Sequence, residues 1–385
     1  RDFETIRRVA QANKEGKSDK EYCQRLINAW SEETHDISFE SHRAHINSGL
    51  SPGNYKGVIP YTNVRGDLTW IPEWRTYQDE WSYLMFRQRT TDRMRKKGSI
   101  DFSIIPVPSR QDFLLYYYQK FFENGFDGIY WDNIYLQSSY NLFFGPVYQR
   151  VDGQKQPYVD IFHCRELVKR TMVLSHQQGK PNLSMVHMTN ANLLPIFSFA
   201  GSLLGWEWKY GLTDFQDRFS PEYIRAVNLP FNSGCIPVQL SGIHGEGTQE
   251  VKDWCARTRA AVTLVHELHV WNPDKLLTSI WEMLWKMGYG TGRVKTYRYW
   301  EEPALLLPNK NDLLWIVHSE REKAVAIFCD YGQGGPAVVR IDTGCLGFKP
   351  ALALDWETNQ PLSLKGEVLS FPYRKHDLKV IILQK

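Results

Sequence analysis

Polar side chains stand at the ends of successive apolar segments in this sequence. Residues 125–133 read Gly-Phe-Asp-Gly-Ile-Tyr-Trp-Asp-Asn, a short apolar strand that stops on the carboxylate of Asp132. Alternation along a strand places Gly128, Tyr130 and Asp132 on one face and Trp131 on the other. A carboxylate at the C-terminal end of a strand that follows a helix is where α/β barrels carry catalytic groups. The simpler alternative is that Asp132 caps the next segment through its backbone.

The strands predicted after Asp132 also end on polar or aromatic groups. If the strands lie parallel in a barrel, these groups converge on one rim. We expect them at the ends of segments 182–189, 202–208, 235–240 and 260–268. They are His187 and Asn190, then Trp206, Glu207, Trp208 and Tyr210, then Gln239, and lastly Glu267 and His269 on the same side of the final strand.

Two of these groups could form a catalytic carboxylate pair. Cleavage of a glycosidic bond needs one carboxyl group that protonates the leaving oxygen and another that attacks carbon or activates water. Asp132 and Glu207 come from strands two apart, which places their backbones ~9–10 Å apart at the rim. The apolar wall of Trp206 and Trp208 favours the protonated form of Glu207. We therefore assign Glu207 as general acid/base and Asp132 as nucleophile or base. The alternative for Glu207 is an ion pair with Lys209 or with an Arg on the rim.

The remaining candidates are assigned to substrate binding. Aromatic residues make up 14% of the chain, and aromatic faces stack on the C–H faces of sugar rings. Trp131, Trp206, Trp208 and Tyr210 are the expected stacking walls. The expected hydroxyl binders are His187, Asn190, Gln239, Glu267 and His269, although a buried ion pair or hydrogen-bond network explains the last two equally well.

Metal chemistry is the main rival, because several of these residues are potential ligands. The segment His266-Glu267-Leu268-His269 is not H-E-x-x-H, and a strand cannot place both histidines on one face. We expect no metal and no cofactor. The adjacent pair Asp79 and Glu80, which could serve substrate-assisted chemistry, falls in an expected aromatic loop and not at a strand end.

The elements that position these residues alternate between strands and helices. Helices are expected at 3–13, 19–31, 113–124, 162–179, 192–199, 221–228, 249–259 and 274–287, with Asn272 and Pro273 starting the last one. A strand at 57–63 precedes the strand that ends at Asp132. This alternation predicts a parallel sheet with right-handed crossovers, best satisfied by a (β/α)8 TIM-like barrel, with a doubly wound open sheet as the alternative. Because only six or seven strands are counted, one strand is missed near the start or one or two precede Arg1.

The periodicity changes after about residue 299. Short strands without helices are expected at 313–318, 324–331, 337–343, 351–356, 367–371 and 378–383, a pattern typical of an antiparallel sandwich. The predicted organisation is therefore a barrel over 1–300 followed by a small all-β sandwich domain over 301–385.

Composition excludes several classes of protein. The 385 residues carry a net charge of +3 from 46 basic and 43 acidic residues, which gives no electrostatic basis for binding nucleic acid. The sequence has no stretch of ~18 apolar residues, so no membrane span is predicted. Six scattered cysteines predict mostly buried free thiols. A chain that opens on a charged helix without Met looks like a processed N-terminus, and we expect a secreted or periplasmic protein from its glycan chemistry.

Residues 125–132 resemble the fourth-strand motif of α-glycosidase barrels similar to glycoside hydrolase families 31 and 36. The resemblance implies a (β/α)8 barrel with a C-terminal β-sandwich and a nucleophile at the position of Asp132. Those families typically carry an Asp acid on the sixth strand, where this sequence has Glu207. The Glu207 strand also resembles bacterial barrels similar to family 123, whose adjacent Asp-Glu pair is absent from the strand ends here.

The sequence thus predicts a glycoside hydrolase that cleaves an oligo- or polysaccharide with two carboxylates. The alternatives are a non-catalytic carbohydrate-binding barrel and a metal-dependent lyase or aldolase. Substrate identity, stereochemical outcome and oligomeric state are not encoded in these patterns.

Overall fold

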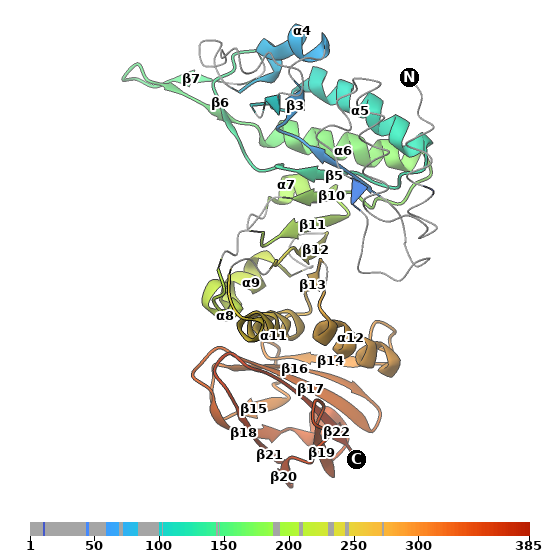
Figure 1. Cartoon of the computed structure of the whole chain (residues 1–385), viewed down its shortest axis with the longest axis vertical. Coiled ribbons are helices and arrows are strands. Elements are labelled where there is room, and N and C mark those ends of the chain that lie inside the picture. Colours follow the sequence, from blue (N-terminus) through green and yellow to red (C-terminus); the bar gives the residue numbers. More distant parts are fainter. Residues whose placement is uncertain are drawn as a thin grey trace. The chain divides into compact units, whose positions relative to one another are not determined.

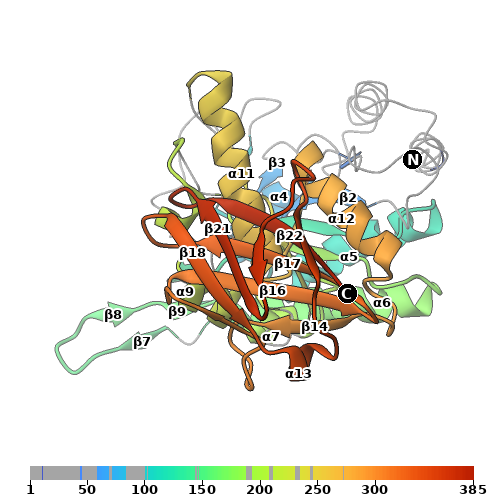
Figure 2. The same ribbon diagram turned by 90° about the horizontal axis from the view of Figure 1, so that it is seen from below.

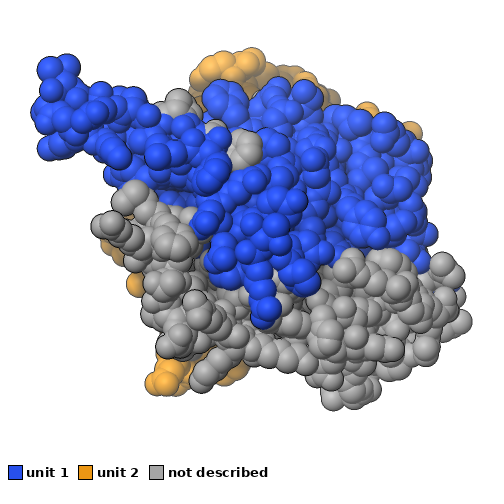
Figure 3. Space-filling model, turned by 90° about the horizontal axis from the view of Figure 1, so that it is seen from above, with its two compact units in different colours: residues 1–206, 230–238 blue, residues 207–229, 239–385 orange. Residues whose placement is uncertain are grey.

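The computed structural model describes residues 11, 44–45, 59–68, 72–83, 100–101, 103–143, 145, 147–187, 193–207, 211–229, 235–242, 246–271 and 273–385 (Figure 1). The chain forms two compact units, coloured separately in Figure 3. Unit 1 comprises residues 1–206 and 230–238, and unit 2 comprises residues 207–229 and 239–385. The predicted helices at 3–13 and 19–31 lie almost entirely outside the described residues.

A mainly parallel sheet forms the centre of unit 1. Within this unit the strands follow the order β1-β2-β5-β10-β11-β12, with β1 antiparallel to β2 and parallel pairing from β2 through β5 and β10 to β11. The strands are β1 (Ala44–His45), β2 (Ile59–Asn63), β5 (Tyr130–Asp132), β10 (Met185–His187), β11 (Ser202–Gly205) and β12 (Ile236–Gln239). The predicted α/β arrangement with a parallel sheet is confirmed, whereas closure into a barrel stays a prediction.

Two long helices, α5 (Pro108–Glu123) and α6 (Ile161–Gln177), pack against this sheet. Pro108 starts α5, where its missing N–H and fixed φ are tolerated. The core joins Phe121 and Leu167 of the helices to Trp131 and Val186 of the strands. Short elements complete the unit: β3 (Asp67–Leu68), α4 (Pro72–Trp81), β4 (Ile100–Asp101), β6 (Ser138–Ser139), β7 (Tyr148–Gln149), β8 (Lys155–Gln156), β9 (Tyr158–Val159) and α7 (Leu194–Phe197).

Unit 2 begins with helices and ends with a β-sandwich. The helices are α8 (Phe215–Arg218), α9 (Pro221–Val227), α11 (Gln249–Val265), α12 (Lys275–Met287) and α13 (Thr343–Leu346), and β13 (His269–Val270) lies between α11 and α12. Thr248 caps α11 and Asp274 caps α12, because their side-chain oxygens accept the backbone N–H groups of Val251 and Leu277. The N-cap of α12 is therefore Asp274 and not Asn272, which lies outside the described residues.

The C-terminal strands form two antiparallel sheets, and this part of the prediction is confirmed (Figure 2). Their orders are β14-β16-β17-β22-β19 and β15-β18-β21-β20. Side chains from both sheets, including Phe328, Ile381, Val339 and Leu369, form one apolar core. The strands are β14 (Lys295–Arg298), β15 (Leu306–Pro308), β16 (Leu313–Glu320), β17 (Lys323–Asp330), β18 (Gly335–Ile341), β19 (Leu352–Asp355), β20 (Ser363–Lys365), β21 (Val368–Tyr373) and β22 (Leu378–Gln384).

Two predicted elements are wrong. Residues 260–265 continue α11 and do not form a strand, because a fully buried apolar run has no polar face from which a helix and a strand can be told apart. The supposed aromatic loop contains helix α4, which carries Trp74, Trp81 and the acidic pair Asp79 and Glu80.

Other expectations from composition agree with the described residues. Four of the five cysteines there, Cys164, Cys235, Cys255 and Cys329, are buried thiols, Cys345 is a half-buried thiol, and none of the five is part of a disulfide. No helix among the described residues is both long and apolar enough to cross a membrane.

Candidate active site

Asp132 is the last residue of β5, as predicted, and its position depends on a close approach of two backbones. A Cβ atom on Gly128 would lie 2.7 Å from the backbone carbon of Leu183 and 2.8 Å from the nitrogen of Ser184. Only glycine therefore allows the chain before β5 to lie this close to the chain before β10. The parallel register then places Asn63 of β2 opposite Asp132.

The Asp132 carboxylate is held by hydrogen bonds from neighbouring strands. The Tyr61 hydroxyl on β2 donates to Oδ2, the backbone N–H of Asn133 donates to Oδ1 at 2.8 Å, and His187 Nδ1 on β10 lies 3.2 Å from Oδ1. Burial acts to raise the pKa of Asp132, but the hydrogen bonds from His187 and Tyr61 outweigh it, so this pKa lies below its ordinary value. Asp132 is therefore an ionised carboxylate at neutral pH.

Aromatic rings fix the geometry around this carboxylate. Tyr61 stacks on Tyr130 with ring centroids 5.1 Å apart, and the Tyr130 hydroxyl lies 2.5 Å from His187 Nδ1. His187 is almost fully buried, whereas 21% of the Asp132 side chain is exposed. Tyr61, Tyr130 and His187 thus surround a partly exposed anion, and we call these three residues and Asp132 the Asp132 cluster.

A buried ion pair supports the segment that follows β5. Arg65 pairs with Asp160, and both side chains are almost fully buried. The Arg65 guanidinium also donates to the carbonyl oxygens of Asn133, at 3.2 Å, and Tyr135. Although burial acts to lower the pKa of Arg65, its interactions with Cys164, Asp160 and Tyr135 raise this pKa overall, so Arg65 stays charged. Removal of this cation would leave Asp160 buried without a counter-charge.

Two predicted stacking residues lie in the core and not at a surface. Trp131 is fully buried, and its indole N–H donates to the Tyr118 hydroxyl at 3.1 Å on the opposite face of the strand from Asp132. Trp206 is also fully buried. Neither ring has an exposed face on which a sugar could stack, so these two assignments are wrong for the structure as described. Trp206 has φ 65°, which is uncommon for a bulky residue and marks local strain at the end of β11.

Four further predicted residues come from the strand ends after β10 and β11. Asn190, Trp208 and Tyr210 lie outside the described residues. Glu207 follows Trp206 as the first residue of unit 2 and is half-buried, in a turn after β11 and not within the strand. Because Asp132 belongs to unit 1, the pairing of Asp132 with Glu207 stays a prediction.

Gln239, the last residue of β12, lies in unit 2 and is fully buried. Neither atom of its side-chain amide has a hydrogen-bond partner among the described residues. A buried amide without partners costs about 1–3 kcal/mol, so this position favours a bound hydroxyl or water that satisfies it. Its predicted role as a hydroxyl binder stays a prediction.

Glu267 and His269 do not lie side by side on one strand. Glu267 lies in the turn after α11 with φ 55°, where its carboxylate accepts hydrogen bonds from Arg298, at 2.5 Å, and the Tyr289 hydroxyl, at 2.8 Å. His269 lies on β13 with an exposed side chain. The ion pair with Arg298 supports the structural alternative for Glu267, in which the residue joins α11 to the first sandwich strand.

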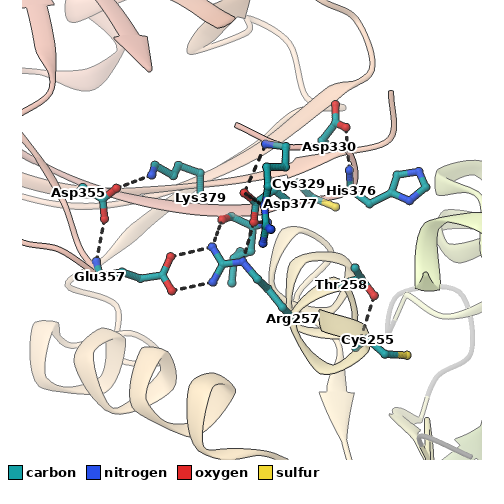
Figure 4. A network of polar contacts seen from close by, with 12 residues as sticks. Cys255, Arg257, Thr258, Cys329, Asp330, Asp355, Glu357, His376, Asp377 and Lys379 are labelled. Carbon is teal, nitrogen blue, oxygen red and sulfur yellow. Dashed lines mark hydrogen bonds and ion pairs between the residues drawn. The ribbon is translucent and has the colours of Figure 1, made fainter. Parts of the chain in front are cut away.

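One group of three potential metal ligands occurs among the described residues. Ligand atoms of Asp214, Asp217 and His376 lie within 4.8 Å of one another. His376 Nδ1 lies 2.8 Å from Asp214 Oδ2, and the backbone N–H of His376 donates to buried Asp330 (Figure 4). These contacts join α8 to the turn between β21 and β22, which accounts for the cluster as a structural one.

Sequence reasoning missed the residues that support Asp132. Tyr61 and Asn63 are two positions apart in a predicted strand, so alternation places both on one face. Pairing of β2 with β5 in parallel register then brings Tyr61 beside Tyr130. Arg65 and Asp160 gave no signal, because 95 positions separate them and only tertiary structure brings them together.

Comparison with solved structures finds glycoside hydrolases of low similarity. A GH27 β-L-arabinopyranosidase from Geobacillus stearothermophilus is 14% identical, with a TM-score of 0.49 over 84% of this chain and 73% of that one. An α-galactosidase I from Mortierella vinacea is 12% identical, with a TM-score of 0.41 over 69% of this chain and 70% of that one. A maltogenic α-amylase from Thermotoga neapolitana is 8% identical, with a TM-score of 0.46 over 84% of this chain and 77% of that one.

No protein-family model matches the chain, and no curated protein sequence matches it. At such identities and scores the likeness to solved structures carries no argument about activity. The function is therefore argued from the Asp132 cluster itself.

Proposed function

We propose that this protein is a glycoside hydrolase that acts on an oligo- or polysaccharide, with Asp132 as its nucleophile or general base. The observation that carries the proposal is an ionised, 21% exposed carboxylate at the C-terminal end of a parallel strand. α/β enzymes with parallel strands gather their reacting groups at this edge. Tyr61 and His187 orient the carboxylate and keep it deprotonated, which suits attack on carbon or activation of water and not proton donation.

The acid in this proposal is Glu207. A two-carboxylate mechanism needs a second carboxyl group that protonates the leaving oxygen, and Glu207 is the residue that we assign to this step. Glu207 is half-buried and follows the fully buried Trp206 directly. The strained backbone at Trp206 favours a functional role for this turn.

Sugar hydroxyl groups would be recognised by Gln239, whose side-chain amide has no partner among the residues that the structure describes and can both donate and accept a hydrogen bond. His187 acts as a positioning residue, because its Nδ1 lies within reach of both Asp132 and Tyr130. No step of the proposed reaction needs a metal or a cofactor, since two carboxyl groups suffice to cleave a glycosidic bond.

The test is a panel of aryl glycosides and polysaccharides, with the anomeric configuration of the product followed by NMR. We expect hydrolysis of at least one substrate, and we expect the Asp132→Asn and Glu207→Gln variants to lose it while they still fold, which a cooperative thermal unfolding transition would show. Full activity in either variant would remove that residue from the mechanism. Binding of glycans without turnover by the unmodified protein would instead support a carbohydrate-binding protein.

A further inference from the structure

Unit 2 contains a cavity of about 730 Å³ that the proposed active site does not use. Its walls come from one face of α11, the first residues of α12 and the turn between β21 and β22. Cavities of roughly 300–1,000 Å³ are typical of small-molecule sites. The lining is mainly apolar, with charged groups around it, and includes Glu250, Asp253, Trp254, Arg257, Lys275 and Arg374.

Trp254 is the aromatic side chain that lines this cavity. The side chain is half-buried, and the guanidinium carbon of Arg374 lies over the ring at 4.0 Å from its centroid. Arg374 is itself 71% exposed and lies 4.0 Å from Asp377 through Nε, too far for a strong ion pair. The guanidinium group therefore occupies the position over the ring in which a sugar ring would stack, and its ion pair with Asp377 holds it there only weakly.

The charges around the cavity select no ionic ligand. Acidic Glu250, Asp253 and Asp274 balance basic Arg257, Lys275 and Arg374 in number. Arg257 already donates to both carboxylate oxygens of Glu357, at 2.6 and 2.7 Å, and to Asp377 at 2.6 Å (Figure 4).

Asp274 is engaged as well, because it accepts hydrogen bonds from Arg259 at 2.5 Å and from the backbone of Leu277 at 2.9 Å. These contacts make a rigid wall and leave no excess charge. An aromatic face surrounded by hydrogen-bond donors and acceptors, with equal numbers of positive and negative groups, matches a neutral polyhydroxylated ring.

We infer that this cavity is a second carbohydrate site, in which a neutral pyranose unit stacks on Trp254 after the Arg374 side chain moves aside. The inference rests on the proposed function for its substrate class, but its site lies wholly in unit 2 and shares no residue with the Asp132 cluster. Such a site would hold a polymer chain on the enzyme without taking part in bond cleavage.

Affinity electrophoresis of the full chain tests the inference, with starch, galactomannan, arabinogalactan or xylan in the gel. We expect at least one of these polysaccharides to retard the unmodified protein and Trp254→Ala to weaken that binding roughly tenfold. Trp254→Phe, which keeps an aromatic ring, should retain most of it. Trp285→Ala is the matched control, because Trp285 is 57% exposed on α12 and does not line the cavity.

Arg374→Ala provides a test that does not depend on the folding of a Trp variant, since Arg374 is a surface side chain. Removal of the competing guanidinium should make retardation stronger, and unchanged or weaker retardation would contradict the inference. Equal retardation of Trp254→Ala and the unmodified protein, or no retardation of the unmodified protein by any of the four polysaccharides, would overturn it.

Hydrolysis of a small aryl glycoside separates this result from the proposed function. Trp254→Ala should hydrolyse it as fast as the unmodified protein, because the second site does not contact the cleaved bond. A protein that is retarded through Trp254 but hydrolyses nothing would refute the catalytic proposal alone.

Discussion

Replacement of Tyr61 by phenylalanine removes the hydrogen bond that the Tyr61 hydroxyl donates to the Asp132 carboxylate. The ring that stacks on Tyr130 at 5.1 Å is retained, so no cavity is created. A hydrogen bond to a charged group is worth about 1.5–3 kcal/mol, and partial exposure of Asp132 favours the lower end. Because about 1.4 kcal/mol corresponds to a tenfold change in an equilibrium, the affinity of Asp132 for a proton should rise roughly tenfold.

The expected result is a shift of the acid side of the activity profile. The pKa of Asp132 rises in Tyr61→Phe, so the rate of aryl-glycoside hydrolysis should begin to fall at a higher pH than in the unmodified protein. Rates near neutral pH should change far less, because the carboxylate is ionised there in both proteins. An acid limb that stays in place would refute the assignment of Tyr61 as the group that keeps Asp132 ionised.

Stability provides a second reading of the same substitution. Because the pKa of Asp132 is lower in the folded protein than in the unfolded chain, its ionisation stabilises the fold at pH values above the unfolded-state pKa. This contribution is lost as the pH falls through the folded-state pKa. Urea unfolding should therefore show Tyr61→Phe to be less stable at neutral pH, with the difference vanishing in strong acid. Tyr118→Phe is the matched control, since its hydroxyl contacts Trp131 and Thr62 on the other face of the sheet and not Asp132.

Three further substitutions test the fold around these sites by urea unfolding. Arg257→Met should lower the free energy of unfolding by about 3 kcal/mol, because it leaves two carboxylates without the 18% exposed guanidinium that now pairs with both. Its control is Arg293→Met, at a 62% exposed side chain, which should change this free energy by less than about 0.5 kcal/mol. Gly201→Ala should lower the free energy of unfolding by about 1–3 kcal/mol, because its Cβ would lie 2.1 Å from a backbone carbonyl oxygen. Gly292→Ala, where a Cβ would meet open space, should leave this free energy unchanged. Burial lowers the pKa of His318 to about 4, so the free energy of unfolding should fall as pH drops from about 6.5 to 4. This residue contributes at most about 3 kcal/mol to that fall. In His318→Gln the free energy of unfolding should depend less steeply on pH over this range.

The sequence patterns located the strand ends better than the side chains around them. Asp132 was predictable because glycine, alternation and an abrupt polar residue coincide within nine positions. Trp131 was assigned to a sugar-binding wall although alternation places it on the face opposite Asp132, and the structure buries it there. Trp206 shows a different limit, since its positive φ turns the chain in a way that strand periodicity does not anticipate.

The missed residues and misassigned elements share a physical cause, because tertiary contacts determine their positions and their secondary structure. The end of α11 is buried all round, so its pattern fits either regular structure, and Glu267 was consequently placed on a strand when it lies in a turn. Tyr61 and Arg65 reach Asp132 and its following segment only through the register of β2 against β5. No local pattern encodes that register.

Chemical rescue of Asp132→Gly tests the central claim most directly. We predict that this variant loses glycoside hydrolysis by a factor of at least about 10²–10⁴ and that added formate or azide restores part of the rate, because a small anion can fill the space of the missing carboxylate. Hydrolysis by Asp132→Gly at the rate of the unmodified protein, with no response to either anion, would contradict the role assigned to Asp132.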